Sequence, residues 1–435
     1  MDSAPARPAG RLLRVLGLAF GLATVVGGVI GAGILRQPGV VAGAIGDPVL
    51  IVSLWVVGGL MAAVNACIIV ELGASLPRAG GPYALVAHGL GERPGALIGW
   101  VDWFAGMSTL AFLSVAFAEF VQRAGLFTDR PLGLLAVALI LAAFVLNWQG
   151  TRTNGLFQTI FCGAKGVALA AILLVLLLAP AAPQPPPETP GAAIGLAALA
   201  IAMRAIHNTY IGYHTPIYVG EEMEAPERNV ARSVFGGLAL VATLYILINI
   251  ALLTVLTPEE MAASPLALAE GAVKALGPGG GVAVAAFGVL SVAASVNLRL
   301  MTHSRGAYAM ARDGALPAGL ARVAPGGSPR VALTLTMLGG VALAASGAYL
   351  AIVAINAPLR ILIEISLILT LVRLRKIAPA MPRPFRVPLY PLPVVLALLL
   401  NSALLAGVIW EDPRNSGIAL AAIGAAGLFI WWRRP

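Results

Sequence analysis

The sequence predicts an all-α integral membrane protein of about twelve transmembrane helices, formed by two inverted repeats of five spans and two additional helices. Hydrophobic residues make up 59% of the 435 residues and charged residues 11%, with a mean hydropathy of +0.91. This balance excludes an ordinary soluble domain. Apolar stretches of about 20 residues, the length that crosses a bilayer, follow one another along nearly the whole chain. The first and sixth stretches are interrupted, and they begin the two proposed repeats.

The apolar stretches define the expected spans and their grouping. We place the spans at residues 16–41, 48–72, 95–121, 132–148, 154–179, 193–219, 232–256, 281–302, 329–346, 349–372, 391–410 and 416–432. The grouping predicts a cytoplasmic segment (1–15), a first repeat (16–179), an external connector (180–192), a second repeat (193–372) and two final helices (373–435). The connector is rich in proline, which favours an extended chain.

The distribution of lysine and arginine predicts the orientation, because these residues are enriched in cytoplasmic loops. The loops after spans eight and ten are the most basic. Only Arg123, Arg130, Lys274 and Arg414 fall on the other side. We therefore expect a multi-pass protein of the cell (inner) membrane with both termini cytoplasmic. The net charge of +9 is then a topology signal whose partners are anionic lipid headgroups, and we assign it no role in nucleic-acid binding.

The first span carries a glycine cluster, Gly27, Gly28, Gly31 and Gly33, in the middle of its apolar run. Each glycine costs about 1 kcal/mol relative to alanine in a helix interior, so the helix is expected to break here. Broken backbone at membrane depth is tolerated where it is buried in protein or lines a cavity. The break is therefore a candidate binding site, and close helix packing through small residues is the alternative interpretation.

The sixth span carries a matching irregularity. Polar groups cluster from Arg204 to His214, and Pro216, which lacks a backbone donor, follows them. We expect a second break near residues 210–213, where Gly212 permits local unwinding. Paired breaks at equivalent positions of two repeats are typical of transporters that bind their substrate at the bilayer midplane.

Five ordered motifs resemble the amino acid-polyamine-organocation permeases, and together they cover nearly the whole chain. They are Gly28-Val29-Ile30-Gly31-Ala32-Gly33-Ile34; Glu71-Leu72-Gly73 with Gly80-Gly81-Pro82-Tyr83; Glu221-Glu222 with Pro226, Arg228-Asn229 and Arg232; Ser304-Arg305 with 308–314 and Pro317; and Arg383-Pro384-Phe385-Arg386-Val387-Pro388. The resemblance implies a LeuT-type fold, similar to proton-coupled bacterial amino acid transporters, in which an amino acid lies between the two broken helices.

The expected binding residues follow from that implication. Amide groups at a half-helix amino terminus favour an anion, so the first break is assigned to the substrate carboxylate. Carbonyl groups of the second break are assigned to the ammonium group. Spans three and eight are expected to line the side-chain pocket. The substrate-binding set is Ile30, Gly31, Ala32, Gly33, Tyr210, Ile211, Gly212, Tyr213, Trp103, Met107 and Asn297.

Lys165 is the only lysine inside a predicted span. A charge at the bilayer centre costs about 2.5 to 3.5 kcal/mol on insertion scales, so its ammonium group must be paired, hydrated or deprotonated. In the resembled family, a lysine of this pattern occupies the place that sodium takes in sodium-coupled relatives, which suggests proton coupling through Lys165. The alternative is a fixed cation bonded to carbonyl groups of the broken first helix.

Four further polar residues within the spans are candidates for gating. Arg360 and Glu364 lie four residues apart on span ten, where they can neutralise each other as a structural pair. Arg204 and His207 lie three apart on span six and can face the external vestibule or form packing hydrogen bonds. A gating role is the alternative for each pair.

The sequence thus predicts secondary active transport by alternating access, with small or apolar neutral amino acids as substrates and proton symport as the coupling. Amino acid exchange, transport of cationic amino acids or polyamines, and a non-transporting sensor or channel are the alternatives. No motif of a catalytic site is present, so no enzyme activity is expected. We expect no cofactor and no metal. We expect a monomer or homodimer without an obligate accessory subunit, because Cys67 and Cys162 both fall inside spans.

Overall fold

The computed structural model describes residues 12–181 and 195–433, and every regular element among them is helical. The helices that match the predicted first repeat are α1 (Leu18–Val29), α2 (Gly33–Ile45), α3 (Pro48–Ser75), α5 (Glu92–Arg123), α6 (Leu132–Trp148) and α7 (Thr151–Leu178). Those that match the second are α8 (Leu196–Tyr210), α9 (Pro226–Val255), α12 (Pro278–Arg312), α13 (Arg330–Ala345) and α14 (Tyr349–Ile377), followed by α15 (Leu392–Glu411) and α16 (Pro413–Arg433). Each of the twelve predicted spans coincides with one helix or one interrupted helix. Most of the predicted connector, and most of the predicted amino-terminal segment, lie outside the described residues.

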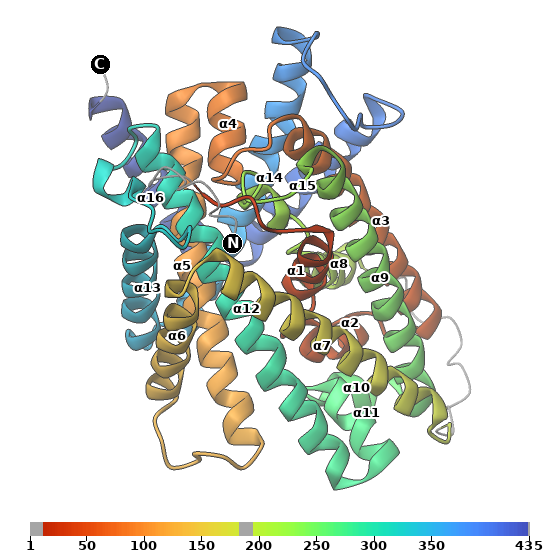
Figure 1. Cartoon of the computed structure of the whole chain (residues 1–435). Coiled ribbons are helices and arrows are strands. Elements are labelled where there is room, and N and C mark those ends of the chain that lie inside the picture. Colours follow the sequence, from red (N-terminus) through yellow and green to blue (C-terminus); the bar gives the residue numbers. More distant parts are fainter. Residues whose placement is uncertain (1–11, 182–194, 434–435) are drawn as a thin grey trace, which may run out of the picture.

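Short helices that the sequence did not predict lie at the two ends of the bundle. They are α4 (Pro82–Leu90), α10 (Pro258–Ala263), α11 (Ala267–Leu276) and the 3-10 turn η2 (Ala318–Ala321). The 3-10 turn η1 (Thr215–Tyr218) instead lies within the predicted sixth span, after its break. In Figure 1, α4 lies at the top of the bundle, and α10 and α11 lie at the bottom. We call these ends the α4 face and the α11 face.

The α11 face carries a capped hairpin. Thr257 and Glu260 form a reciprocal capping box at the start of α10. Lys274 of α11 lies 2.7 Å from Glu260. The hydrogen bond from Lys274 lowers the pKa of the Glu260 carboxyl below its ordinary value. The pair is exposed at both ends, so it adds little to stability.

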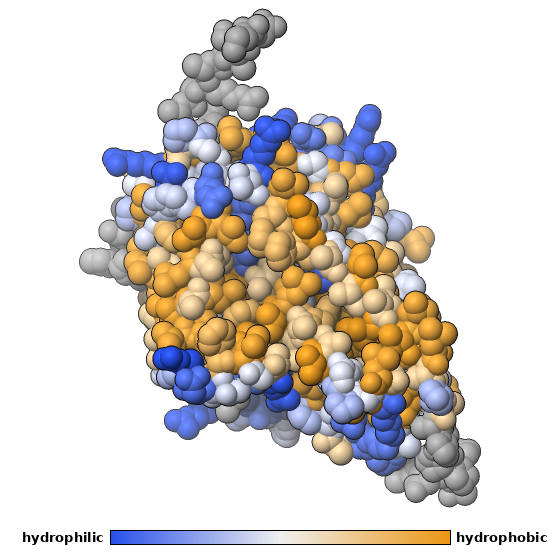
Figure 2. All heavy atoms as spheres, turned by 60° about the horizontal axis from the view of Figure 1, so that its bottom comes forward, coloured by the Kyte–Doolittle hydropathy of each residue, from blue (hydrophilic) through white to orange (hydrophobic). Residues whose placement is uncertain are grey.

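The helices are long and apolar enough to cross a membrane. Seven of the described helices pass as single spans, and α1 and α2 pass together as a pair bent by 42°. The helices α6 and α13 are apolar but shorter. Large apolar side chains cover the outside, such as Leu178 (77% exposed) and Leu399 (62%). Figure 2 shows a broad hydrophobic band with hydrophilic residues gathered at both ends. The chain is therefore a multi-pass membrane protein, whose apolar surface faces lipid.

Both predicted breaks are present. The backbone leaves the helical conformation between Val29 and Gly33, where α1 gives way to α2. It leaves it again after Tyr210, where α8 ends, and a turn leads into η1 at Thr215. The long helix α5 packs against α12 and α14, while α1 packs against α7 and α9, and α2 against α8. The two breaks are thus enclosed by long helices from both halves of the chain.

A candidate amino acid site between two broken helices

The two breaks touch each other through their backbones. A Cβ atom at Gly212 would lie 2.2 Å from the Gly28 carbonyl oxygen, and one at Gly28 would lie 2.6 Å from the Gly212 carbonyl oxygen. Gly212 also has φ of +133°, which side chains with a Cβ rarely adopt. A Cβ at Gly33 would meet Thr209 at 3.1 Å. The absence of a side chain at these glycines lets the two breaks meet.

The predicted contacts to a substrate differ in how accessible they are. Gly31, Ala32 and Gly33 are half-buried at the amino end of α2, and Ile211 is half-buried just after α8. The Ile30 carbonyl instead accepts hydrogen bonds from Lys165 and Ser291. The accessible backbone groups at the breaks are thus the amide end of α2 and the carboxyl end of α8. Such a pair of helix ends suits a zwitterion.

Two tyrosines of the second break are fully buried. The Tyr210 hydroxyl donates to the Trp55 carbonyl at 3.2 Å, and its ring packs against Trp55 and Tyr245. The side chain of Tyr210 therefore anchors α8 to α3 and α9. The Tyr213 hydroxyl is buried and has no hydrogen-bond partner.

Lys165 is completely buried on α7 against the first break. Its ammonium group donates to the Gly27 carbonyl, to the Ile30 carbonyl at 2.6 Å, to the Ser295 hydroxyl at 3.0 Å and to the Ser291 carbonyl at 3.3 Å. Gly27 and Ile30 flank the end of α1, whose last carbonyl groups have no partner within the helix. The lysine therefore satisfies the broken end of α1 and ties it to α7 and α12.

Asn297 lies in a network of buried amides and not at the breaks. Its amide nitrogen donates to Asn154 at 2.8 Å and to Gln158 at 2.7 Å, and its amide oxygen accepts from Asn147 at 2.8 Å. The Asn154 nitrogen in turn donates to Asn147. This amide network joins α6, α7 and α12. Because all hydrogen-bonding groups of Asn297 are occupied by protein, the prediction that it lines the substrate pocket needs correction.

The predicted pocket residues of α5 also face elsewhere. The Trp103 indole donates to Thr336 of α13 at 2.9 Å. The Met107 sulfur lies 2.1 Å from where a Cβ at Gly339 of α13 would be. Both side chains contact α13, so the structure does not bring them to the breaks.

A buried polar cluster includes residues of α5 and α12, the two spans that were expected to line the side-chain pocket. The Tyr218 hydroxyl donates to Asp102 at 2.7 Å. Arg360 lies 3.5 Å from Asp102 and donates to Thr109 at 3.1 Å. His303 lies 3.9 Å from Asp102. This cluster joins α5, α12, α14 and η1, and it pairs its acidic group with a buried arginine.

The expected pairing of Arg360 with Glu364 is therefore wrong, because Arg360 turns to Asp102 of α5. Glu364 instead lies 3.8 Å from His207 of α8. Arg204 lies 3.0 Å from Glu411 of α15. The structure separates Arg204 from His207 and brings His207 to Glu364.

The α4 face is closed by a buried ion pair that sequence reasoning missed. Arg305 of α12 donates to both carboxylate oxygens of Glu222, at 2.9 and 3.0 Å, and Thr151 of α7 donates to the same carboxylate at 2.9 Å. The arginine and glutamate side chains are 1% and 0% exposed. The backbone before α1 is hydrogen-bonded to the loop that carries Glu222, because the Leu16 amide donates to the Glu222 carbonyl. Glu222 and Arg305 both belong to the family motifs described above. Their opposite charges were the signal that could have predicted an ion pair between them.

The α11 face is closed more loosely. Arg36 of α2 pairs with Glu119 of α5, and both side chains are about a third exposed. A cavity of about 400 Å³ lies beside Glu119, between α5, α6, α13 and α14, and no predicted site residue lines it. Among the described residues, no group of three or more potential ligands is placed to hold a metal ion.

Comparisons with known proteins agree with this architecture. The model of a family described as amino acid permease matches residues 13–430. The chain is 28% identical to the serine/threonine exchanger SteT of Bacillus subtilis, over 97% of both chains. It is 30% identical to large neutral amino acids transporter small subunit 2 of Oryctolagus cuniculus, over 98% of this chain and 82% of the relative. It is 29% identical to b(0,+)-type amino acid transporter 1 of Mus musculus, over 70% and 64%.

Proposed function

The chain belongs to the amino acid permease family, and from this premise we propose that it exchanges neutral amino acids across the cell membrane by alternating access. The close approach of Gly33 to Thr209 carries the proposal, because it places the amide end of α2 beside the carboxyl end of α8. The proposed contacts are the residue 30–33 backbone for the carboxylate and the residue 210–213 backbone for the ammonium group.

The names of the relatives support a neutral substrate and an exchange reaction. One relative is named for serine and threonine exchange and another for large neutral amino acids. The polar cluster is compatible with a neutral substrate because Arg360 and Asp102 pair with each other. A ligand therefore does not need to supply a charge to either.

The contacts of Lys165 favour a fixed cation over a proton carrier. Four acceptors surround three N–H donors, and a neutral amine would leave the carbonyl groups at the end of α1 short of a donor. An unsatisfied carbonyl group in hydrocarbon costs several kcal/mol. Proton symport through Lys165 remains the second candidate, since the lysine contacts the break directly.

We propose that the α4 face lies on the cytoplasmic side, because the basic loops gather there. The five-plus-five inverted repeat is also a proposal, and the presence of the two breaks supports it.

We further propose that the chain works without an accessory subunit. Both cysteines lie within helices α3 and α7, where they are not placed for a disulfide to a second subunit.

The test is counterflow of radiolabelled amino acids in proteoliposomes that contain the purified chain alone. We expect serine, threonine and larger neutral amino acids to exchange, with no change in lumenal pH and no loss of counterflow when a protonophore is added. Substrate-driven lumenal acidification would instead favour symport. No counterflow with any of the twenty amino acids would refute the proposed function.

Lys165 variants separate its two roles. Lys165→Met removes the ammonium group, and we expect counterflow to fall by more than about tenfold and the melting temperature to drop, since the Gly27 and Ile30 carbonyl groups lose a charged donor and keep only serine hydroxyls at 3.3 and 3.2 Å. Val167→Met, at an exposed position of the same helix, is the control. A Lys165→Met variant with normal counterflow but no proton-driven accumulation would support the proton carrier.

A further inference from the structure

Glu364 and His207 form a second buried polar site, separate from the backbone groups assigned to the substrate. Glu364 of α14 and His207 of α8 are each more than nine-tenths buried. The Glu364 Oε2 atom and the His207 Nε2 atom both lack a hydrogen-bond partner. They are 3.8 Å apart, which is too far for a direct hydrogen bond.

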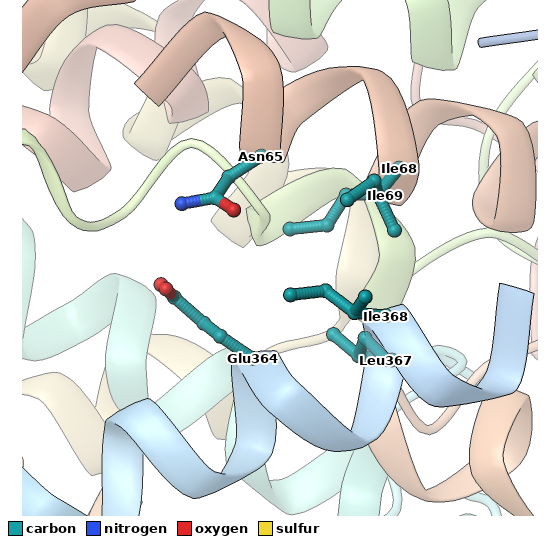
Figure 3. A pocket seen from close by; sticks show the side chains of 6 residues that line it. All are labelled: Asn65, Ile68, Ile69, Glu364, Leu367 and Ile368. Carbon is teal, nitrogen blue, oxygen red and sulfur yellow. The ribbon is translucent and has the colours of Figure 1, made fainter. Parts of the chain in front are cut away.

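A small cavity adjoins Glu364. Asn65 and Glu364 line it together with apolar side chains of α3 and α14, and its space for the centre of a water molecule is about 10 Å³. That is close to the minimum room for a single water. Figure 3 shows the amide of Asn65 and the carboxyl group of Glu364 pointing toward each other across the gap. One water placed here has a carboxyl group and an amide as partners.

Among the described residues, Glu364 has no lysine or arginine within ion-pair distance, because Arg360, one turn away on α14, is paired with Asp102. The groups on the elements packed around it are Arg360, His207, Tyr213, Asp102, His303, Glu71 and Glu411. Arg360 is held by Asp102, which also faces His303. Glu71 pairs with Arg375, and Glu411 pairs with Arg204. His207 and Tyr213 are the remaining neighbours, and the Tyr213 hydroxyl is also unpartnered.

An ionised carboxylate without a partner is costly inside a membrane protein. A proton removes that cost, because a protonated Glu364 carries no charge and its O–H group can donate to a water. A sodium ion fits less well, since hard cations take oxygen ligands and this site presents an imidazole nitrogen. The chemistry of the site therefore selects a proton.

We propose that Glu364 and His207 bind one proton, and that this proton is required for the closed arrangement of α3, α8 and α14. The inference rests on the proposed transport function. His207 lies in the last turn of α8, which ends at the second break just before Gly212, and Gly212 touches the first break. Loss of the proton leaves a charge that water must solvate, which opens the contact between α8 and α14. Exchange then slows as pH rises, although the proton does not have to cross the membrane.

The test is counterflow between pH 5 and pH 9, with equal pH on both sides. We expect the wild-type rate to fall by about tenfold or more toward high pH, the effect of roughly 1.4 kcal/mol. Glu364→Gln keeps the shape without the ionisation, so its rate should be nearly independent of pH. Glu411→Gln removes a carboxylate that already pairs with Arg204 and should keep the wild-type profile. A Glu364→Gln profile equal to that of the wild type, or a flat wild-type profile, overturns the proposal.

A second measurement does not depend on transport, so it tests the proposal even if a variant fails to fold or the protein shows no counterflow. Infrared difference spectra of the purified wild-type chain should show a protonated carboxylic acid band that disappears at high pH and is absent from Glu364→Gln at the same low pH. Replacing sodium by a large organic cation should change nothing. A band that persists unchanged in Glu364→Gln, or dependence on sodium, refutes the assignment of the proton to this site. Absence of counterflow with a normal band would refute the proposed function alone.

Discussion

Loss of the ion pair between Glu222 and Arg305 should open the α4 face. The pair is completely buried and makes two hydrogen bonds of 2.9 and 3.0 Å, with a third from Thr151. Glu222→Gln leaves the arginine charge without compensation, and breaking a buried pair in this way costs about 3–5 kcal/mol. If the cost falls on the closed state, the equilibrium between closed and open α4 face shifts by roughly 10² to several 10³-fold, at about 1.4 kcal/mol per tenfold.

The exposure of Ser304, which is fully buried beside Arg305, reports this opening. A Ser304→Cys reporter in a chain without Cys67 and Cys162 is labelled with a polar maleimide in detergent. We expect labelling to accelerate by about 10²-fold or more with Glu222→Gln. The control is Glu221→Gln, whose pair with Arg312 is about a quarter exposed. Such a pair contributes up to about 1 kcal/mol, so labelling should change by less than about fivefold.

The double variant Glu222→Leu/Arg305→Met separates pairing from general damage. A buried pair replaced by apolar side chains of similar volume is often neutral in stability. We therefore expect the double variant to be more stable than either single variant. The reasoning is refuted if Glu222→Gln labels and melts like the parent, or if the effects of the two single changes simply add.

Two further predictions concern the breaks and the amide network. Gly212→Ala should reduce counterflow by more than about tenfold, because its φ costs about 1–3 kcal/mol and its Cβ meets the Gly28 carbonyl; Gly407→Ala, in open space on α15, should leave transport unchanged. Normal transport by Gly212→Ala would mean that the two backbones do not meet. Asn297→Leu should lower the free energy of unfolding by about 1–3 kcal/mol, seen as a lower melting temperature, and leave the apparent substrate affinity of the folded protein unchanged. A large change in apparent substrate affinity at normal stability would indicate that Asn297 contacts the substrate.

Much of the architecture was predictable because long apolar runs and clustered glycines have few structural outcomes in a membrane. Four glycines within seven residues allowed the first break to be predicted. A glycine followed by a proline allowed the second to be predicted. The short helices α4, α10 and α11 were not predicted, because each is too brief to give an apolar stretch of spanning length.

The orientation of the pocket side chains was not predictable from the sequence. A helix in this chain is apolar on nearly all sides, so its composition does not show which face turns to which neighbour. Trp103 and Met107 were assigned to the substrate and instead contact α13, while Asp102, on the same helix, reaches Arg360. The spacing of Arg360 and Glu364 along one helix likewise suggested that they form an ion pair. In the structure, Arg360 pairs with Asp102 of α5 and Glu364 lies next to His207 of α8.

The two faces of the bundle are closed by ion pairs of unequal strength. On the α4 face, Glu222 and Arg305 are buried and hydrogen-bonded, and their separation leaves an uncompensated charge. On the α11 face, Arg36 and Glu119 are about a third exposed, and water solvates both when they part. Breaking the ion pair of the α11 face therefore costs less than breaking that of the α4 face. Arg36 lies on the same helix as the proposed carboxylate contacts. Under the proposed function, a substrate that binds the amide end of α2 would therefore also act on the weaker ion pair.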